Sequence, residues 1–276
     1  MTIYETTRRP LGPATLAVKV PPVTALFWVI KVLTTGMGET ASDFLARAMA
    51  PPVAVGLAFC ALVVALTVQV RARRFRTAVY WFAVVMVSVF GTMAADVLHV
   101  GLGIPYAIST VAFAIALAVV LIVWYVSERT LSIHTVTRGR PELFYWATVL
   151  VTFALGTAAG DLTAAGLGWG YLLSGFVFAA AIAVPALAYR TGRLGAVAAF
   201  WTAYVITRPL GASFADWMGV PVARGGLGWG TGPVTAAWAL VIVALVAFLS
   251  VRRAAPASPP AAAVPASPPA AAASAN

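Results

Sequence analysis

The sequence contains few charged residues, two histidines and a single cysteine among 276 residues. One cysteine cannot form an internal disulfide, and without a cysteine cluster a site for a soft metal ion is not expected. Cys60 lies in the middle of an apolar segment, where we interpret it as a small packing residue. No pairing of a nucleophile with a base emerges, nor does a motif for haem, flavin or phosphate. The sequence therefore does not predict an enzyme.

Apolar residues are present in large excess. They make up 62% of the chain against 9% charged residues, which is outside the range of soluble domains and indicates a polytopic membrane protein. A helix needs about 20 apolar residues to cross a hydrocarbon core of roughly 30 Å. Eight segments meet this need: 24–46, 52–70, 79–99, 106–126, 143–164, 171–189, 197–219 and 232–250. The predicted fold class is all-α, with eight transmembrane helices in contact with the lipid bilayer.

The basic residues are distributed unevenly between the loops, in a chain with a formal net charge of +10. Before the first span and after each even-numbered span lie Arg8, Arg9, Lys19, Arg71, Arg73, Arg74, Arg76, Arg129, Arg138, Arg140, Arg190, Arg193, Arg252 and Arg253. The loops on the other side hold only Arg47 and Arg224. By the positive-inside rule both termini are cytoplasmic, and the basic excess requires no nucleic-acid partner.

A fourfold internal repeat runs through the chain. Its units read FW…GETASD, YW…GTMAAD, YW…GTAAGD and FW…GASFAD, in which a glycine follows the tryptophan by ten residues and an aspartate follows the glycine by five. The tryptophans are Trp28, Trp81, Trp146 and Trp201, the glycines Gly38, Gly91, Gly156 and Gly211, and the aspartates Asp43, Asp96, Asp161 and Asp216. A second repeated motif, GLG, begins at residues 101, 166 and 226.

Each unit contains two spans, so all four copies have the same orientation and are parallel repeats about an axis along the membrane normal. The tryptophans are expected at the cytoplasmic interface. Fifteen residues at 1.5 Å each then place all four aspartates about 22 Å further across, at a common depth. Because charges within the spans fall in odd-numbered helices, we expect those helices to form an inner ring and the even-numbered helices a lipid-facing outer ring. The repeat glycine lies on another side of its helix from the aspartate and suits close packing against a neighbouring helix.

We therefore divide the chain into three parts. Residues 1–22 form a cytoplasmic N-terminal segment, and residues 23–253 form the membrane domain, with repeats at about 23–74, 76–129, 141–193 and 196–253. Residues 254–276 consist almost entirely of Ala, Pro and Ser, which predicts a disordered cytoplasmic tail.

The stretches FWVIKVLTTGMGETASD and ITRPLGASFAD, with the repeated G-x4-D units, resemble bacterial membrane proteins built from a repeat of unknown function, DUF347. The resemblance covers roughly residues 23–253. It implies a multi-pass protein of the bacterial inner membrane and brings no established activity with it.

Acidic residues in the odd-numbered spans are the candidate site: Glu39, Asp43, Asp96, Asp161 and Asp216. Thr92 and Thr157 lie one helical turn before two of these aspartates, and His99 lies three residues after Asp96 on the same side of its helix. Carboxylates at one depth repel one another unless they are protonated, paired with bases or bridged by a cation. Oxygen ligands suit Mn²⁺, Mg²⁺ or a proton, so these five acids are also the candidate metal ligands. The alternative is structural, with each aspartate capping the segment that follows it or accepting hydrogen bonds from a re-entrant Gly-rich turn.

Two basic residues also lie within the spans. Lys31 is three residues past Trp28, so we expect its amine to snorkel to the cytoplasmic interface. Arg208 lies about 10 Å inside the membrane and Glu39 about 16 Å inside, by the same helical rise. This difference in depth permits an ion pair between Arg208 and Glu39. The pair would either hold the first and seventh spans together or take part in gating.

These features favour a transporter or exporter of a small cation, such as a Mn²⁺-like divalent ion, with or without proton coupling. One alternative is a carrier of an anionic or zwitterionic solute bound by Arg208. Another is a membrane scaffold or sensor subunit whose aspartates are structural. No cofactor is expected beyond a bound divalent cation, and nothing in the sequence excludes a homo-oligomer.

Overall fold

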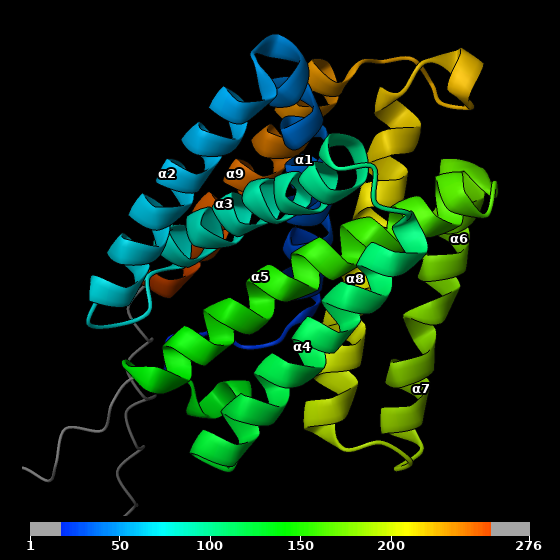
Figure 1. The fold of residues 1–276 in the computed structure, drawn as a ribbon. Helices are drawn as coiled ribbons and strands as arrows, with labels where there is room; N and C mark the ends of the chain where they lie inside the picture. Colours follow the sequence, from blue (N-terminus) through cyan, green and yellow to red (C-terminus); the bar gives the residue numbers. More distant parts are fainter. Residues whose placement is uncertain (1–17, 255–276) are drawn as a thin grey trace, which may run out of the picture.

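The computed structural model describes residues 18–254, and this part of the chain is helical throughout. Four helices carry the repeat motif: α1 (Ala25–Ala48), α3 (Thr77–Asp96), α5 (Arg140–Asp161) and α8 (Ala196–Gly219). The others are α2 (Pro51–Arg71), α4 (Tyr106–Glu128), α6 (Gly170–Ala181), α7 (Ala183–Arg190) and α9 (Thr231–Ala254). Because α6 and α7 together form one span, the eight predicted spans are confirmed as helices (Figure 1).

Judged by length and composition alone, six of the eight spans in residues 18–254 are long and apolar enough to cross a membrane. The two that fall short are α1 and α8, which contain buried charged residues: Lys31 and Glu39 in α1, Arg208 and Asp216 in α8. A charge within a span is tolerated where other helices shield it from lipid. The position of α1 and α8 inside the bundle supplies this shielding.

The four motif-bearing helices close into an inner ring. Helix α1 packs against α3 and α8, and α5 packs against the same two neighbours from the other side. Each outer helix packs chiefly on the inner helix of the next repeat: α2 on α3, α4 on α5, α6 on α8, and α9 back on α1. Figure 1 shows α2 and α9 on one flank of this bundle and α6 and α7 on the other. The expected inner and outer rings are confirmed, and each repeat is completed by its neighbour rather than by itself.

The repeat glycines allow the inner helices to touch. At each of the four, an added Cβ would lie less than 3.0 Å from an atom of the next inner helix. The residue met is always the one seven positions after the tryptophan of that next repeat, so the contact recurs around the ring. The four pairs are Gly38 with Ser88, Gly91 with Phe153, Gly156 with Arg208, and Gly211 with Thr35. The predicted packing role of these glycines is confirmed.

The GLG segments turn the chain from an inner helix to the following outer helix. Their last glycines, Gly103, Gly168 and Gly228, have φ angles of 65°, 71° and 72°. Residues with a Cβ rarely adopt this left-handed backbone, which explains why a glycine recurs there. In repeats two and three a π-helical turn precedes the GLG turn, η1 (Val97–Gly101) after Asp96 and η3 (Leu162–Gly166) after Asp161.

The opposite end of the bundle, here called the basic end, is closed by aromatic and polar contacts. Trp81, Trp146 and Trp201 are buried among the inner helices, and their predicted level at the cytoplasmic interface stays a prediction. The Lys19 amine, 1% exposed, lies 2.6 Å from the Glu142 carboxylate, and the Gln69 amide donates to the same carboxylate at 3.1 Å. This buried cluster joins the segment before α1 to the end of α2 and the start of α5.

Two predictions from the sequence fall elsewhere. Cys60 is exposed on α2, so its interpretation as a packing residue is wrong, because α2 directs this side outward. Residues 1–17 and the Ala/Pro/Ser-rich stretch after residue 254 lie outside the described residues, and their predicted character stays a prediction.

Candidate cation site at the carboxylate end

The ion pair expected between Arg208 and Glu39 is present. One terminal nitrogen of Arg208 lies 2.7 Å from Oε2 of Glu39, and the two side chains are 0% and 6% exposed. The same nitrogen contacts the hydroxyls of Thr92 and Thr157, and the other donates to the Thr35 carbonyl at 2.7 Å. The pair therefore joins all four inner helices at one level.

The repeat explains this geometry. Glu39, Thr92 and Thr157 occupy the same motif position, immediately after the repeat glycine, and each faces the axis of the ring. The fourth repeat has Ala212 at this position, which is 3% exposed. The small side chain leaves room for Arg208, one helical turn earlier on the same helix, to reach the other three.

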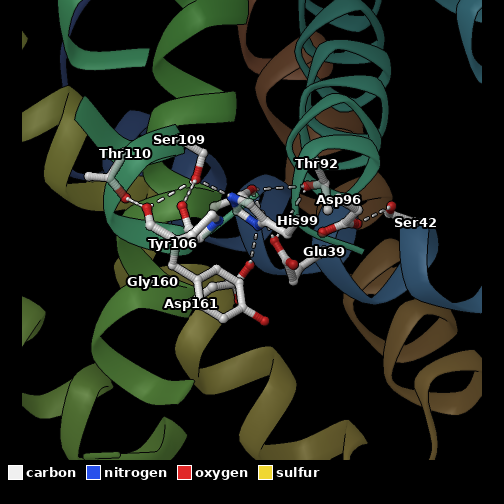
Figure 2. A network of polar contacts seen from close by, with 12 residues as sticks. Glu39, Ser42, Thr92, Asp96, His99, Tyr106, Ser109, Thr110, Gly160 and Asp161 are labelled. Atoms are coloured by element: carbon white, nitrogen blue, oxygen red, sulfur yellow. Dashed lines mark hydrogen bonds and ion pairs between the residues drawn. The ribbon is translucent and has the colours of Figure 1, made fainter. Parts of the chain in front are cut away.

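A second polar cluster lies next to this pair. Single ligand atoms of Asp96, His99 and Asp161 lie within 4.8 Å of one another. Nδ1 of His99 is 3.4 Å from Oδ2 of Asp161, and its Nε2 is 2.5 Å from the Ser109 hydroxyl. Figure 2 shows the imidazole between Ser109 and Asp161, with Asp96 on the side of Ser42. Two carboxylates and one imidazole therefore converge from repeats two and three.

Local structure positions this cluster. His99 lies in η1, immediately beyond Asp96, and Asp161 is the residue before η3. A π-helical turn changes the angle between successive side chains and is often found at functional sites. The Tyr106 ring packs edge-on against the His99 ring at a centroid distance of 4.7 Å, and the Ser109 contact restrains the imidazole from the α4 side.

The other two aspartates lie outside this group. Asp43 contacts Arg47, one turn later on α1, at 2.5 Å, and its side chain is 29% exposed. Asp216 is 8% exposed, and no described residue hydrogen bonds to its carboxylate. The structure thus places Asp96, His99 and Asp161 together, assigns Glu39 to Arg208, and leaves Asp43 and Asp216 apart from both clusters.

The carboxylate end of the bundle is the end that holds Glu39 and the four motif aspartates. Its negative charge is only partly balanced. The carboxylates of Glu39, Asp43, Asp96, Asp161 and Asp216 are close enough to repel one another electrostatically. Arg208 neutralises Glu39 and Arg47 neutralises Asp43 by direct contact. Among the described residues, the Asp96 carboxylate accepts a hydrogen bond only from the Ser42 hydroxyl, at 3.4 Å. The remaining excess of negative charge favours binding of a proton or a cation.

The capping role considered for the aspartates is absent at two of them. Asp96 and Asp161 occupy the cap positions before η1 and η3, yet neither side chain makes a capping hydrogen bond. Their side chains instead face His99 and Ser42. The expectation that these aspartates cap the following segment is wrong, because the helix continues through them without an interruption that would expose free N–H groups.

Lys31 also departs from expectation. Its side chain is 1% exposed, and the amine lies 4.1 Å from the ring centre of Phe153 and 4.2 Å from that of Tyr204. The amine has no hydrogen-bond partner among the described residues. The snorkelling prediction is wrong, because the side chain points into the inner ring rather than along α1 to the interface.

Sequence reasoning missed Ser42 and Ser109. Ser42 precedes a motif aspartate, but the other repeats place alanine or glycine there, so the repeat does not mark it. Ser109 is a buried hydroxyl on an outer helix that was expected to face lipid. The position of Ser109 shortly after a GLG turn was the only sequence feature that could have identified it.

The model of the Repeat of Unknown Function (DUF347) matches four times, at residues 26–75, 79–130, 144–193 and 199–255. The chain belongs to the DUF347 family. No curated protein and no solved structure matches it.

Each DUF347 repeat contributes one inner and one outer helix to the bundle. The second and third repeats supply the Asp96, His99 and Asp161 cluster, and the first and fourth supply the Glu39 and Arg208 pair. Four copies of one DUF347 unit have therefore diverged into two different polar sites.

Proposed function

We propose that this DUF347 protein is a membrane transporter or exporter of a small divalent cation, and that Asp96, His99 and Asp161 form its binding site. The observation that carries the proposal is the convergence of these three ligand atoms within 4.8 Å inside a multi-span bundle. Ionisable residues within spans usually mark an ion or substrate pathway.

The chemistry of the three ligands favours some cations over others. Carboxylates suit Mg²⁺ and Mn²⁺, whereas an imidazole adds preference for Mn²⁺ or Zn²⁺ over Mg²⁺ and Ca²⁺. A divalent ion would also relieve the repulsion between the Asp96 and Asp161 carboxylates. The contact of His99 Nε2 with Ser109 supports this role, because a metal-binding histidine usually engages its other ring nitrogen in a hydrogen bond.

The described conformation is closed between the proposed site and the basic end. Arg208, Phe153, Lys31 and Tyr204 are almost fully buried on the inner face of the ring. Transport from the carboxylate end to the basic end therefore requires these helices to move apart. The ring contacts at the repeat glycines are the surfaces along which the four repeats would separate.

The two alternatives differ in their support. An anionic solute bound by Arg208 is disfavoured, because this side chain is 0% exposed and both terminal nitrogens bond to the chain itself. A scaffold or sensor subunit fits the closely packed interior, but it gives no reason for Asp96, His99 and Asp161 to converge.

Thermal stability with added cations tests the site. A ligand that binds only the folded state stabilises it by about 2.7 kcal/mol at one hundred times its Kd. We expect Mn²⁺ or Zn²⁺ to raise the Tm of the purified protein, with a smaller effect from Mg²⁺, Ca²⁺ and Na⁺. Asp96→Asn, His99→Gln and Asp161→Asn should each abolish the rise. The matched control is Asp43→Asn, which removes a nearby carboxylate outside the cluster and should retain the effect.

Flux in proteoliposomes separates a transporter from a scaffold. The ion that stabilises the protein should enter or leave vesicles containing the wild-type chain, and this flux should be lost in Asp161→Asn. Stabilisation without flux would support a sensor or scaffold with a bound ion. If no cation changes the Tm of the wild type, the metal-site proposal is overturned.

A further inference from the structure

An apolar groove lies at the basic end of the bundle, away from the candidate cation site. Its volume is about 630 Å³, within the usual range of roughly 300–1,000 Å³ for small-molecule sites. Helices α7 and α8, the η2 segment (Ile133–Thr135) and the start of α1 form its walls. Most of the surface that lines it is carbon, so it suits a hydrocarbon chain.

The sequence of the sixth span creates this groove. Pro185 has no N–H and cannot donate to the carbonyl four residues earlier, which interrupts the helix between α6 and α7 at Ile182. Alanines line both walls beyond the break, including Ala186 on α7 and Ala199 on α8. Small side chains facing one another leave the space open.

Two arginines follow the last groove-lining residue of α7 in the chain. Arg190 ends α7 directly after the lining residue Tyr189, and Arg193 lies in the short loop that leads into α8. The backbone N–H of Arg193 donates to the Ala188 carbonyl, which holds this loop against the end of α7. Both arginine side chains are exposed, and His134 lines the groove from η2. Among the described residues, none that lines the groove is acidic.

We infer that this groove is a binding site for an anionic phospholipid. One acyl chain lies in the apolar groove, and the phosphate-bearing headgroup faces Arg190 and Arg193. Basic residues next to a membrane attract anionic headgroups. By the charge distribution of the loops this end faces the cytoplasmic leaflet. The site is separate from the proposed cation site and does not depend on it.

Native mass spectrometry of the full chain, purified in mild detergent and titrated with phosphatidylglycerol or phosphatidylcholine of equal chain length, tests the inference. We expect the wild type to retain one phosphatidylglycerol molecule in clear preference to phosphatidylcholine. Ala186→Trp fills the groove and should abolish retention. The matched control, Val184→Trp, changes a residue of the same helix that is 65% exposed and does not line the groove, so retention should persist.

Removing the charges tests the headgroup contact. Each arginine near the surface is worth about a fivefold preference for an anionic lipid, so Arg190→Gln with Arg193→Gln should lower the preference by roughly 25-fold. The control pair, Arg73→Gln with Arg74→Gln, removes two exposed charges from another loop at the same end and should leave the preference intact.

Other results would overturn the inference. Equal retention of both lipids, or unchanged retention in Ala186→Trp, would do so. A change in oligomeric state of Ala186→Trp without loss of lipid would identify the groove as an interface between copies. If Ala186→Trp does not reach the wild-type Tm, the smaller Ala199→Leu substitution takes its place with the same expected loss.

Discussion

Substitution of the repeat glycines by alanine should destabilise the bundle, although alanine is the better helix former. At Gly211 an added Cβ would meet the hydroxyl of Thr35 and lie 2.6 Å from the Val32 carbonyl oxygen. A backbone atom cannot rotate away, so α1 and α8 must separate. Forcing extra volume into a packed interface costs about 1–3 kcal/mol. We expect Gly211→Ala at or above the upper end of this range.

The chain provides a matched control for this prediction. Gly56 lies in outer helix α2, and a Cβ there would meet nothing within 4 Å. Gly56→Ala should therefore stabilise the protein by about 0.5–1 kcal/mol through helix propensity alone. Gly38→Ala should cost less than Gly211→Ala, because the nearest backbone atom at Gly38 is the Ser88 carbonyl carbon at 3.0 Å, whereas at Gly211 it is the Val32 carbonyl oxygen at 2.6 Å.

The assay is equilibrium unfolding in detergent micelles, followed by tryptophan fluorescence, with Tm as a second readout. The decisive comparison is between the ring glycines and Gly56 within one set of variants. If Gly211→Ala and Gly56→Ala change the free energy of unfolding in the same direction and by similar amounts, the inner helices are not held at close contact, and the ring description is refuted.

Two further predictions concern the buried charges. Arg208→Met should lower the free energy of unfolding by about 3–5 kcal/mol, because Glu39 is left buried without its partner. The double variant Glu39→Gln with Arg208→Met should lose about 1–3 kcal/mol less than the sum of the single variants, and strict additivity in this double-mutant cycle would contradict direct coupling. Lys31→Met should raise the free energy of unfolding by about 1–3 kcal/mol, since it removes a buried amine without a hydrogen-bond partner. Lys31→Gln, which keeps a buried polar group, is the control, and a loss of stability in Lys31→Met would show that the contacts of the amine with the Phe153 and Tyr204 rings outweigh the cost of burying it.

Much of the candidate site was visible in the sequence. The motif spacing identified Glu39 with Thr92 and Thr157 as equivalent positions, and the depth argument placed Arg208 beside Glu39. These predictions succeed because residues at fixed helical spacing in parallel repeats must reach similar levels. Lys31 was misplaced for a related reason: depth along a helix was known, but the direction of the side chain within the ring was not.

From the sequence alone one could determine the number of spans, the four parallel repeats, and which helices lie inside. Span length, the spacing of the repeated motif and the absence of charge from the even-numbered spans suffice for these conclusions. The sequence also predicted that the repeat glycines contact a neighbouring helix. It did not say which neighbouring helix each glycine contacts, because one repeat does not specify the side on which the next repeat packs.

Only the tertiary structure decided how the four equivalent aspartates differ. The π-helical turns after Asp96 and Asp161, and the approach of Ser109 from α4, bring two carboxylates to His99, while Asp43 turns to Arg47. These differences depend on contacts between residues far apart in the chain. A periodic motif specifies the level at which a side chain lies, but packing between helices determines which side chain it meets.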